Sequence, residues 1–307
     1  MSMLVSTSPH IRSNKTTSTI MRDVVIALLP ALIASVLIFG FRALLITAVS
    51  VTAAVLTEYL FEKCCKLPIT INDWSAVVTG VLLAYNLPVT IPLWQAALGS
   101  IIAILVVKQL FGGIGKNFAN PAIVGRIVLF LSFSKTMTAW QFPDAVSTAT
   151  PLALMGSGDM ASLPSHLQMF LGLKGGCLGE VCVLALLMGF IYLLARKVIT
   201  WHTPITFMGT VFVLSWLLGG SFDYALSQLL SGGLVLGAVF MATDYVTTPS
   251  TKAGRLVFGL GCGLLTVMIR QWGSYAEGVS FAILFMNILT PYISCWTRSK
   301  PFGGVQA

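Results

Sequence analysis

Apolar segments of helical length follow one another along almost the whole chain, and this pattern constrains the fold more than any other feature. A helix needs about 20 mostly apolar residues to cross a bilayer. Of the 307 residues, 56% are hydrophobic and only 9% are charged, against roughly 25% charged in a soluble domain. We therefore predict an all-α polytopic membrane protein with about ten transmembrane helices. The expected segments are 24–40, 43–61, 75–88, 93–111, 121–134, 178–196, 204–219, 227–242, 255–270 and 279–296.

Two Gly- and Pro-rich stretches, 112–121 and 243–254, predict interrupted helices or re-entrant turns. Such breaks are tolerated in a membrane only where protein or water satisfies the backbone. Similar segments that contain Pro, Gly and Arg start the fifth and ninth helices, so the chain could consist of two related halves. Two halves of five helices each would have opposite orientations in the membrane, as in transporters that build a site at the midplane. Coincidence between two helix starts is the alternative, because Pro near a helix N-terminus is ordinary. The segments 75–88 and 121–134 are too short to span a membrane without tilt or help from neighbours.

The basic residues fall unevenly on the two sides of this topology. With a cytoplasmic N-terminus, only four of the 18 Lys and Arg residues lie outside, and cytoplasmic loops carry such an excess. The outer four are Arg42, Lys135, Lys174 and Arg270. The predicted organisation is a cytoplasmic tail over 1–23, a transmembrane half over 24–134, an outer-face segment over 135–176, a second transmembrane half over 177–297 and a cytoplasmic tail over 298–307. We expect no cleaved signal peptide, because no small-residue cleavage site follows the first apolar segment.

Residues 144–151 form a hydroxyl-rich loop within the expected outer-face segment, with the sequence Asp-Ala-Val-Ser-Thr-Ala-Thr-Pro. A lipid-facing chain does not need such a loop. One interpretation is a polar turn that caps a helix, since Ser, Thr and Asp are common in caps and turns before Pro. The other is a site where a threonine hydroxyl carries a covalently attached cofactor. The residues of the loop leave both interpretations open.

Five acidic residues lie within or beside the apolar segments, where burying a charge is costly. They are Glu58, Asp73, Glu180, Asp244 and Glu277. Glu58 and Glu180 fall inside expected helices, whereas the other three lie at expected helix ends, where capping or interfacial solvation is the commoner explanation. Glu58, Asp73, Glu180 and Asp244 are our candidates for an ion route. The arginines that could hold phosphate, pair with carboxylates or anchor helix ends at the interface are Arg126, Arg255 and Arg270.

Several other kinds of site find no support in the sequence. The six cysteines include no Cys-x-x-Cys pair, so buried thiols are expected rather than disulfides or an iron–sulfur site. The stretch 112–117 is Gly-rich but lacks the Gly-Lys-Ser/Thr ending of a phosphate-binding loop. The histidines, His10, His166 and His202, offer neither a Ser-His-Asp triad nor a metal site. The basic residues are scattered rather than clustered, so nucleic acid is not an expected partner. We therefore predict no catalytic side chain and no metal.

Several short segments, in their order along the chain, resemble the D subunit of the Rnf electron-transport complex. That family is related to the B subunit of the sodium-pumping NADH:quinone oxidoreductase. The segments are 8–12 (SPHIR), 73–80 (DWSAVVTG), 108–117 (KQLFGGIGKN), 120–122 (NPA), 240–244 (FMATD), 254–255 (GR) and 275–282 (YAEGVSFA). Each segment is weak evidence by itself, but their order is very specific, and the resemblance runs almost from end to end.

The resemblance implies that an FMN is joined through its phosphate to a threonine hydroxyl. The family pattern is Asp-x-x-Ser/Thr-x-Ala-Thr, which corresponds here to Asp144, Ser147, Ala149 and Thr150. Thr150 is then the attachment residue. The family often has Gly before the Ala, where this chain has Thr148, so Thr148 is the alternative attachment site. A non-covalent riboflavin in the helix bundle is also implied by the relatives, although no local motif indicates one.

The resemblance further implies a membrane subunit that relays electrons through its flavin while the complex couples ferredoxin:NAD⁺ oxidoreduction to Na⁺ or H⁺ transport. The chain would be catalytic only within that complex. The expected partners are the other subunits, including a second subunit with covalent FMN, a separate flavin transferase that acts outside the cytoplasm, and membrane lipid. The expected location is the plasma membrane of a prokaryote, with the flavin loop on the outer face. The alternatives are a transporter or channel without redox chemistry and a purely structural subunit.

Overall fold

The computed structural model of the chain describes residues 15–140, 149–159, 162–273, 275 and 277–298. Within these ranges every regular element is a helix, which confirms the all-α prediction. Two elements, η2 and η3, are π-helices, and η1 is a 3₁₀ turn. The elements are α1 Thr17–Phe39, α2 Phe41–Cys64, η1 Ile71–Asp73, α3 Ser75–Tyr85, α4 Leu93–Ile102, η2 Ala103–Gln109, α5 Pro121–Ser132, α6 Ser134–Met137, α7 Pro151–Ser157, α8 His166–Leu171, α9 Val183–Ala195, α10 His202–Gly219, α11 Phe222–Leu230, α12 Leu234–Leu236, η3 Gly237–Met241, α13 Lys252–Trp272 and α14 Val279–Trp296.

Each of the ten apolar segments expected from the sequence contains a helix or a pair of helices. Among the described residues, α1, α2, α10, α13 and α14 are long and apolar enough to cross a membrane by themselves. Helix α11 and the helix formed by α12 and η3 meet at a bend of 65° and would make a sixth crossing together. The remaining four, namely α3, α4 with η2, α5 and α9, are shorter apolar helices of 10–17 residues. The chain therefore crosses the membrane several times. Four of its ten segments are shorter than a full span and depend on neighbouring helices to cover the rest of the membrane thickness.

The chain before α9 differs from the helix predicted over 178–196. It enters the bundle as irregular backbone, and α9 starts later than expected. The N–H groups of Leu178 and Gly179 donate to the carbonyls of Leu87 and Tyr85, at the end of α3, at 3.0 and 2.9 Å. A Cβ on Gly179 would overlap the side chain of Tyr85, so the close approach requires glycine. Pairing with α3 thus replaces the helical bonds that the apolar pattern predicted.

The two interruptions expected near 112–121 and 243–254 are present and lie close together. The Asn120 side chain donates to the Met241 carbonyl at 3.3 Å. Asn287 on α14, with its amide oriented to satisfy both partners, donates to the Thr247 carbonyl at 3.2 Å and accepts from Asn120 N at 3.1 Å. Protein groups therefore satisfy the broken backbone, as a membrane requires.

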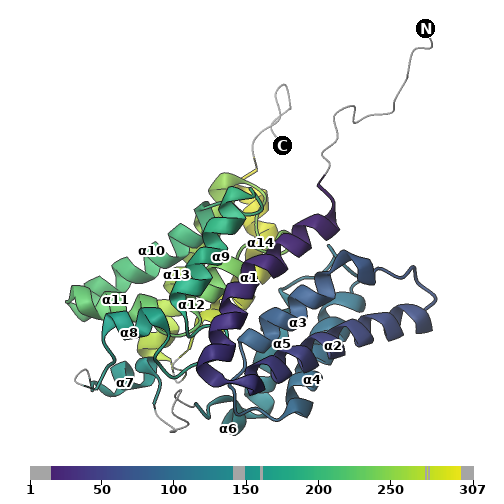
Figure 1. Ribbon diagram of the computed structural model, residues 1–307. Coiled ribbons are helices and arrows are strands. Elements are labelled where there is room, and N and C mark those ends of the chain that lie inside the picture. Colours follow the sequence, from purple (N-terminus) through teal and green to yellow (C-terminus); the bar gives the residue numbers. More distant parts are fainter. Residues whose placement is uncertain (1–14, 141–148, 160–161, 274, 276, 299–307) are drawn as a thin grey trace, which may run out of the picture.

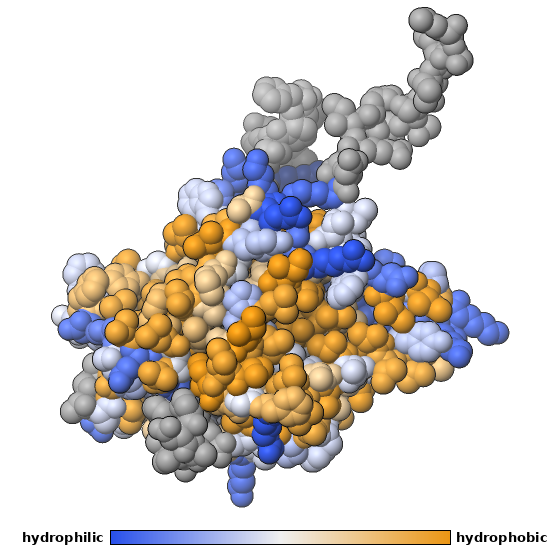
Figure 2. All heavy atoms as spheres, viewed as in Figure 1, coloured by the Kyte–Doolittle hydropathy of each residue, from blue (hydrophilic) through white to orange (hydrophobic). Residues whose placement is uncertain are grey.

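The chain ends and the short connecting helices lie at opposite ends of the bundle (Figure 1). We call the end where α1 begins and α14 stops the terminal end, and the end with α6, α7 and α8 the loop end. Thr251 and Thr297 are hydrogen-bonded at 2.6 Å at the terminal end. At the loop end, Thr90 donates to the Ala139 carbonyl at 2.8 Å. Figure 2 shows hydrophobic side chains over the sides of the bundle and hydrophilic ones gathered at the terminal end, as expected of a membrane-spanning chain.

Candidate functional site

Thr150 caps α7 and lies in the wall of a cavity at the loop end. Its backbone is extended, its hydroxyl oxygen accepts a hydrogen bond from Ala153 N at 3.3 Å, and Pro151 starts the helix. The residue is only 6% exposed. A capping role is therefore real, and it is compatible with a cofactor role because the oxygen of a threonine phosphoester still accepts a hydrogen bond.

The cavity beside Thr150 has a volume of about 410 Å³, within the range of small-molecule sites. Ala149 also lines it, whereas Asp144, Ser147 and Thr148 lie outside the described residues. The residues that surround the cavity are Arg126, Phe130, Met137, Thr138, Trp140, Ala149, Thr150, Ala153, Tyr275 and Glu277. We call this space the Thr150 cavity.

Aromatic side chains form one wall of the Thr150 cavity. The rings of Phe130 and Tyr275 meet edge to face with centroids 5.2 Å apart. Tyr275 in turn stacks on Phe281 at 5.6 Å with an interplanar angle of 15°, and Trp140 lines the same cavity. Offset and edge-to-face contacts of this kind suit a planar ring system.

A buried ion pair forms the inner wall of the Thr150 cavity. Arg126, on α5, is 6% exposed and forms an ion pair with Glu277. The guanidinium also donates to Asn86 Oδ1 at 3.1 Å and to Ser280 Oγ at 2.7 Å. Of the roles that the sequence left open for Arg126, pairing with a carboxylate is confirmed, and anchoring at an interface is wrong for this residue.

Further charged groups surround this ion pair, and together they make up what we call the Arg126 cluster. Its members are Arg126, Lys174, Cys177, Glu180, Arg270 and Glu277. Glu180 Oε1 accepts from Cys177 N at 2.9 Å, and ligand atoms of Cys177, Glu180 and Glu277 lie within 4.8 Å of one another. Lys174 is 1% exposed and donates to the Leu230 carbonyl, so this lysine of the expected outer-face segment is buried in the fold. Arg270 donates to the Gln228 carbonyl at 2.7 Å.

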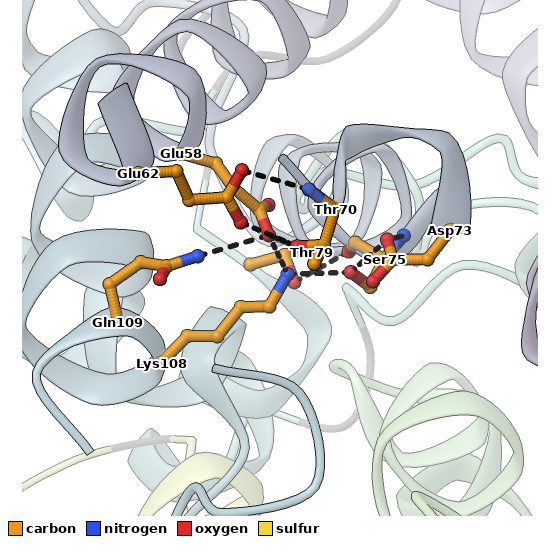
Figure 3. Close-up of polar contacts among 8 residues, drawn as sticks. All are labelled: Glu58, Glu62, Thr70, Asp73, Ser75, Thr79, Lys108 and Gln109. Atoms are coloured by element: carbon orange, nitrogen blue, oxygen red, sulfur yellow. Dashed lines mark hydrogen bonds and ion pairs between the residues drawn. The ribbon is translucent and has the colours of Figure 1, made fainter. Parts of the chain in front are cut away.

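A second polar group, the α2–α3 cluster, lies where α2, α3 and η2 meet (Figure 3). Its members are Glu58, Glu62, Thr70, Asp73, Ser75, Lys108 and Gln109. Lys108 Nζ lies 2.6 Å from Glu58 Oε1 and 2.5 Å from Ser75 Oγ. Glu62 accepts from the backbone N–H and the hydroxyl of Thr70 at 2.9 and 2.5 Å. The cluster has three carboxylates for one ammonium group, so it carries excess negative charge.

The π-helix η2 positions the two side chains that approach Glu58 from the far side of the cluster. Gln109 Nε2 donates to Glu58 Oε1 at 3.0 Å, beside Lys108. Figure 3 shows both side chains pointing from neighbouring positions of η2 toward Glu58. A π-helix has a wider turn than an α-helix and often occurs at functional sites. No feature of the sequence predicts this π-helix, so the contact of Lys108 with Glu58 could not be predicted from the sequence.

Two carboxylate oxygens of the α2–α3 cluster have no hydrogen-bond partner although they are buried. They are Glu58 Oε2 and Asp73 Oδ2. Asp73 Oδ1 accepts from Ser75 N at 2.8 Å and from Ser75 Oγ at 2.5 Å, so it binds the first residue of α3 from the end of η1, although the capping residue of α3 is Trp74. Buried acceptors without partners are costly, so these two oxygens are available to a proton or a cation.

Asp244 lies in the interruption before α13, and its carboxylate is bonded within that segment rather than to either cluster. Its carboxylate accepts from Thr247 Oγ1 at 3.1 Å and from the backbone N–H groups of the two residues that follow it, so it stabilises a turn. The expected helix-capping role is wrong, because α13 begins at Lys252 and its capping residue is Thr251. Asp244 also lines a cleft between the two halves near the terminal end, together with Thr79, Lys108, Asn117 and Phe240. Of the four proposed ion-route residues, the structure thus brings Glu58 and Asp73 together, places Asp244 in a cleft that Lys108 and Ser75 of their cluster also line, and leaves Glu180 in the Arg126 cluster.

The fold and these buried polar clusters define the class of the protein as an all-helical membrane protein with charged groups inside its bundle. A family model described as "NQR2, RnfD, RnfE family" matches residues 4–303. The chain belongs to this family, which confirms the resemblance seen in its sequence.

Three relatives match almost over their full length. The chain is 46% identical to the D subunit of the Na⁺-translocating ferredoxin:NAD⁺ oxidoreductase complex of Acetobacterium woodii, covering 99% of this chain and 96% of that protein. It is 42% identical to the D subunit of the proton-translocating ferredoxin:NAD⁺ oxidoreductase complex of Clostridium ljungdahlii, covering 97% and 96%. It is 37% identical to the D subunit of the ion-translocating oxidoreductase complex of Alcanivorax borkumensis, covering 99% and 97%.

Proposed function

We propose that this chain is the flavin-carrying membrane subunit of an ion-translocating ferredoxin:NAD⁺ oxidoreductase and holds FMN through a phosphoester to Thr150. The relatives named above support the complex, and the Thr150 cavity supports the site. The observation that carries the proposal is the position of Thr150, a largely buried hydroxyl in the wall of a cavity of about 410 Å³ lined by aromatic rings and Arg126.

The residues of the Thr150 cavity fit a flavin in three respects. Phe130, Trp140 and Tyr275 provide apolar faces for a planar ring. Arg126 provides a fixed positive charge next to a group that becomes more negative on reduction. Glu277 Oε1 is buried without a partner and can accept a hydrogen bond from a ring N–H or a hydroxyl. The flavin supplies the redox chemistry, while these residues bind it, orient it and exclude water.

Mass spectrometry of the peptide that contains Thr150 tests this attachment. Protein produced together with its flavin transferase should carry an FMN adduct on Thr150, and Thr150→Val should abolish it while Thr148→Val retains it. An adduct on Thr148 would move the site to the alternative residue. An unmodified peptide from fully matured complex would exclude covalent FMN, and intact electron transfer in Thr150→Val would support a purely structural subunit.

The ion route is a separate part of the proposal and concerns Glu58, Asp73, Glu180 and Asp244. It rests on the burial of Glu58 and Glu180 and the partial burial of Asp73 and Asp244 within an apolar chain, and on the excess negative charge around Glu58 and Asp73. Glu58→Gln should weaken the dependence of complex activity on Na⁺ or H⁺, and Glu62→Gln is the matched control in the same cluster. Unchanged ion dependence after neutral substitution of all four would remove the route. Flux of a substrate through the purified chain without any bound flavin would favour a transporter instead.

A second, non-covalent flavin could enter the cleft lined by Asp244 and Lys108 only if the cleft widened from its volume of about 100 Å³ to that of small-molecule sites. The cleft lies between the halves and combines apolar walls, such as Phe240, with the polar side chains of Thr79 and Asn117. Extraction of the matured Thr150→Val protein with acid should then release riboflavin. A colourless Thr150→Val protein would exclude this second cofactor.

The proposed orientation has both chain ends in the cytoplasm and the loop end outside. It is supported by the positive-inside distribution and by the separation of these two ends in the fold. A cysteine introduced at Ser162 in a background where the exposed cysteines are replaced should react with an impermeant thiol reagent from outside intact cells. Protection of that cysteine until the cells are opened would reverse the orientation.

A further inference from the structure

Positive charges outnumber negative ones in the Arg126 cluster. Arg126, Lys174 and Arg270 face only the carboxylates of Glu180 and Glu277. Among the residues that the structure describes, no carboxylate oxygen lies within 4.0 Å of Lys174 Nζ. The ammonium group is buried and bound to a backbone carbonyl. Arg270 also lacks such a contact within the described part of the chain and bonds only to oxygens of Gln228 and Ser231. The cluster therefore has one positive charge in excess, and Lys174 and Arg270 are its two cations without an ion-pair partner among the described residues.

Arg126 is the cationic member of the Arg126 cluster that lines the Thr150 cavity. Its guanidinium is held by Asn86, Ser280 and Glu277, and its Nη2 also lies 3.7 Å from Cys177 Sγ. Because protein acceptors already hold both Nη atoms, the group cannot turn away when the cavity is filled. A fixed charge in a site of low dielectric acts strongly on a neighbouring charge.

Glu180 balances Arg126 from the opposite side. A Cβ on Gly233 would lie 3.0 Å from Glu180 Oε2 and 3.9 Å from an Nη atom of Arg126, so the absence of a side chain there leaves the two groups open to each other. Glu180 Oε2 is buried and has no hydrogen-bond partner. The other oxygen, Oε1, accepts from Cys177 N, so one of the two carboxylate oxygens is unpartnered, and the negative charge of Glu180 opposes the positive field at the cavity.

We propose that the Arg126 cluster sets the redox potential of the flavin in the Thr150 cavity, with Lys174 and Arg126 raising it and Glu180 lowering it. The inference rests on the proposed attachment of FMN to Thr150. Reduction adds electrons from the low-potential reductant of the complex to the ring, and the cluster side chains gain and lose none. Positive charge beside the ring favours its reduced form, and negative charge favours its oxidised form.

The test is a spectroelectrochemical titration of the matured protein at fixed pH and salt, with dithionite as reductant. Lys174→Met should lower the midpoint potential of the Thr150 flavin, and Glu180→Gln should raise it. The double variant should return close to the unsubstituted protein, because its net charge is the same. Lys252→Met and Asp159→Asn, which remove exposed charges of the same types, are matched controls and should not shift the potential.

Mass spectrometry of the same samples separates this inference from the proposed function. If FMN is present on Thr150 in every sample but the two single variants shift the potential in the same direction, or not at all, the inference is overturned and the attachment stands. If the unsubstituted protein has no adduct, the proposed function fails and the inference fails with it. If one variant does not fold, the other still decides, because each has its own predicted direction.

Discussion

The α2–α3 cluster and the Arg126 cluster are both buried, yet they differ in the sign of their excess charge. Three carboxylates share one ammonium group around Glu58, whereas two carboxylates face three cationic groups around Arg126. Burying unbalanced charge is costly in any protein. Each cluster therefore suits a different kind of missing partner, a cation or proton in the first and an anionic group in the second.

The two clusters also differ in how the fold builds them. The α2–α3 cluster comes from consecutive elements of the first half, with η2 returning to meet α2. The Arg126 cluster combines α5 with irregular backbone before α9 and with the connection between α13 and α14. The hydrogen bonds of the first cluster join residues at most 51 positions apart within one half, whereas those of the second join residues up to 154 positions apart. This difference predicts how each responds to substitution.

Arg126→Met should produce the largest loss of stability. It leaves Glu277 buried without its counter-ion, and breaking a buried ion pair costs about 3–5 kcal/mol. Denaturant unfolding of the protein in detergent micelles would measure the loss. Arg255→Met is the matched control, because Arg255 is half-buried and bonds to a carbonyl and a hydroxyl rather than a carboxylate. Equal losses for the two variants would show that the pair with Glu277 contributes little.

Removing the minority charge of the α2–α3 cluster should cost more than removing a majority charge. Lys108→Met leaves three carboxylates without an ammonium group and should cost about 3 kcal/mol. Glu62→Gln reduces the excess negative charge and retains an acceptor for Thr70, so it should cost less than about 1 kcal/mol. Denaturant unfolding compares the two variants directly. A larger loss for Glu62→Gln would contradict the assigned excess of negative charge.

The membrane class, the family and the position of most helices could be predicted from the sequence, because apolar length and ordered short motifs report them directly. The burial of Glu58 and Glu180 could also be predicted, because both are charged residues inside apolar segments. What could not be predicted was their partners. In the sequence Lys108 and Lys174 served only to assign the two sides of the membrane, but the fold buries them against groups that are remote in the chain.

The irregular entry before α9 shows why a helix boundary escaped prediction. The segment 178–196 is apolar throughout, and apolar periodicity alone favours a helix. The competing backbone bonds to Leu87 and Tyr85 depend on the tertiary position of α3. Glycines before Val183 were the available signal, because glycine allows a close backbone approach.

Gly179→Ala should disturb the Arg126 cluster and spare the α2–α3 cluster. The new Cβ would overlap the Tyr85 side chain and push away the segment that carries Glu180, at a cost of about 1–3 kcal/mol. Denaturant unfolding would measure the loss, and thiol labelling of the buried Cys177 under native conditions would report the local change. Gly156→Ala is the control, because open space surrounds that position. Labelling of Cys177 that stays as slow as in the unsubstituted protein would contradict the expected displacement.

The smallest expected effect concerns coupling between the clusters. Among the described residues, no hydrogen bond or ion pair joins a member of one cluster directly to a member of the other. Distant sites without shared partners are additive within about 0.3–0.5 kcal/mol. The stability changes of Glu62→Gln and Glu180→Gln should therefore add in the double variant.

An interaction energy above about 1 kcal/mol in this double variant would instead mean that the two clusters are energetically coupled. A hydrogen-bonded path leads from Arg126 through Asn86 and Met241 to Asn120, which lines the same cleft as Lys108 of the α2–α3 cluster. Asn86→Ala cuts this path at its first step and should abolish any such coupling, because Asn86 is the side chain that bonds to both Arg126 and Met241. Coupling that persists in Asn86→Ala would have to be transmitted by the packing of the helices. The two oppositely charged clusters would then respond together to a change in that packing.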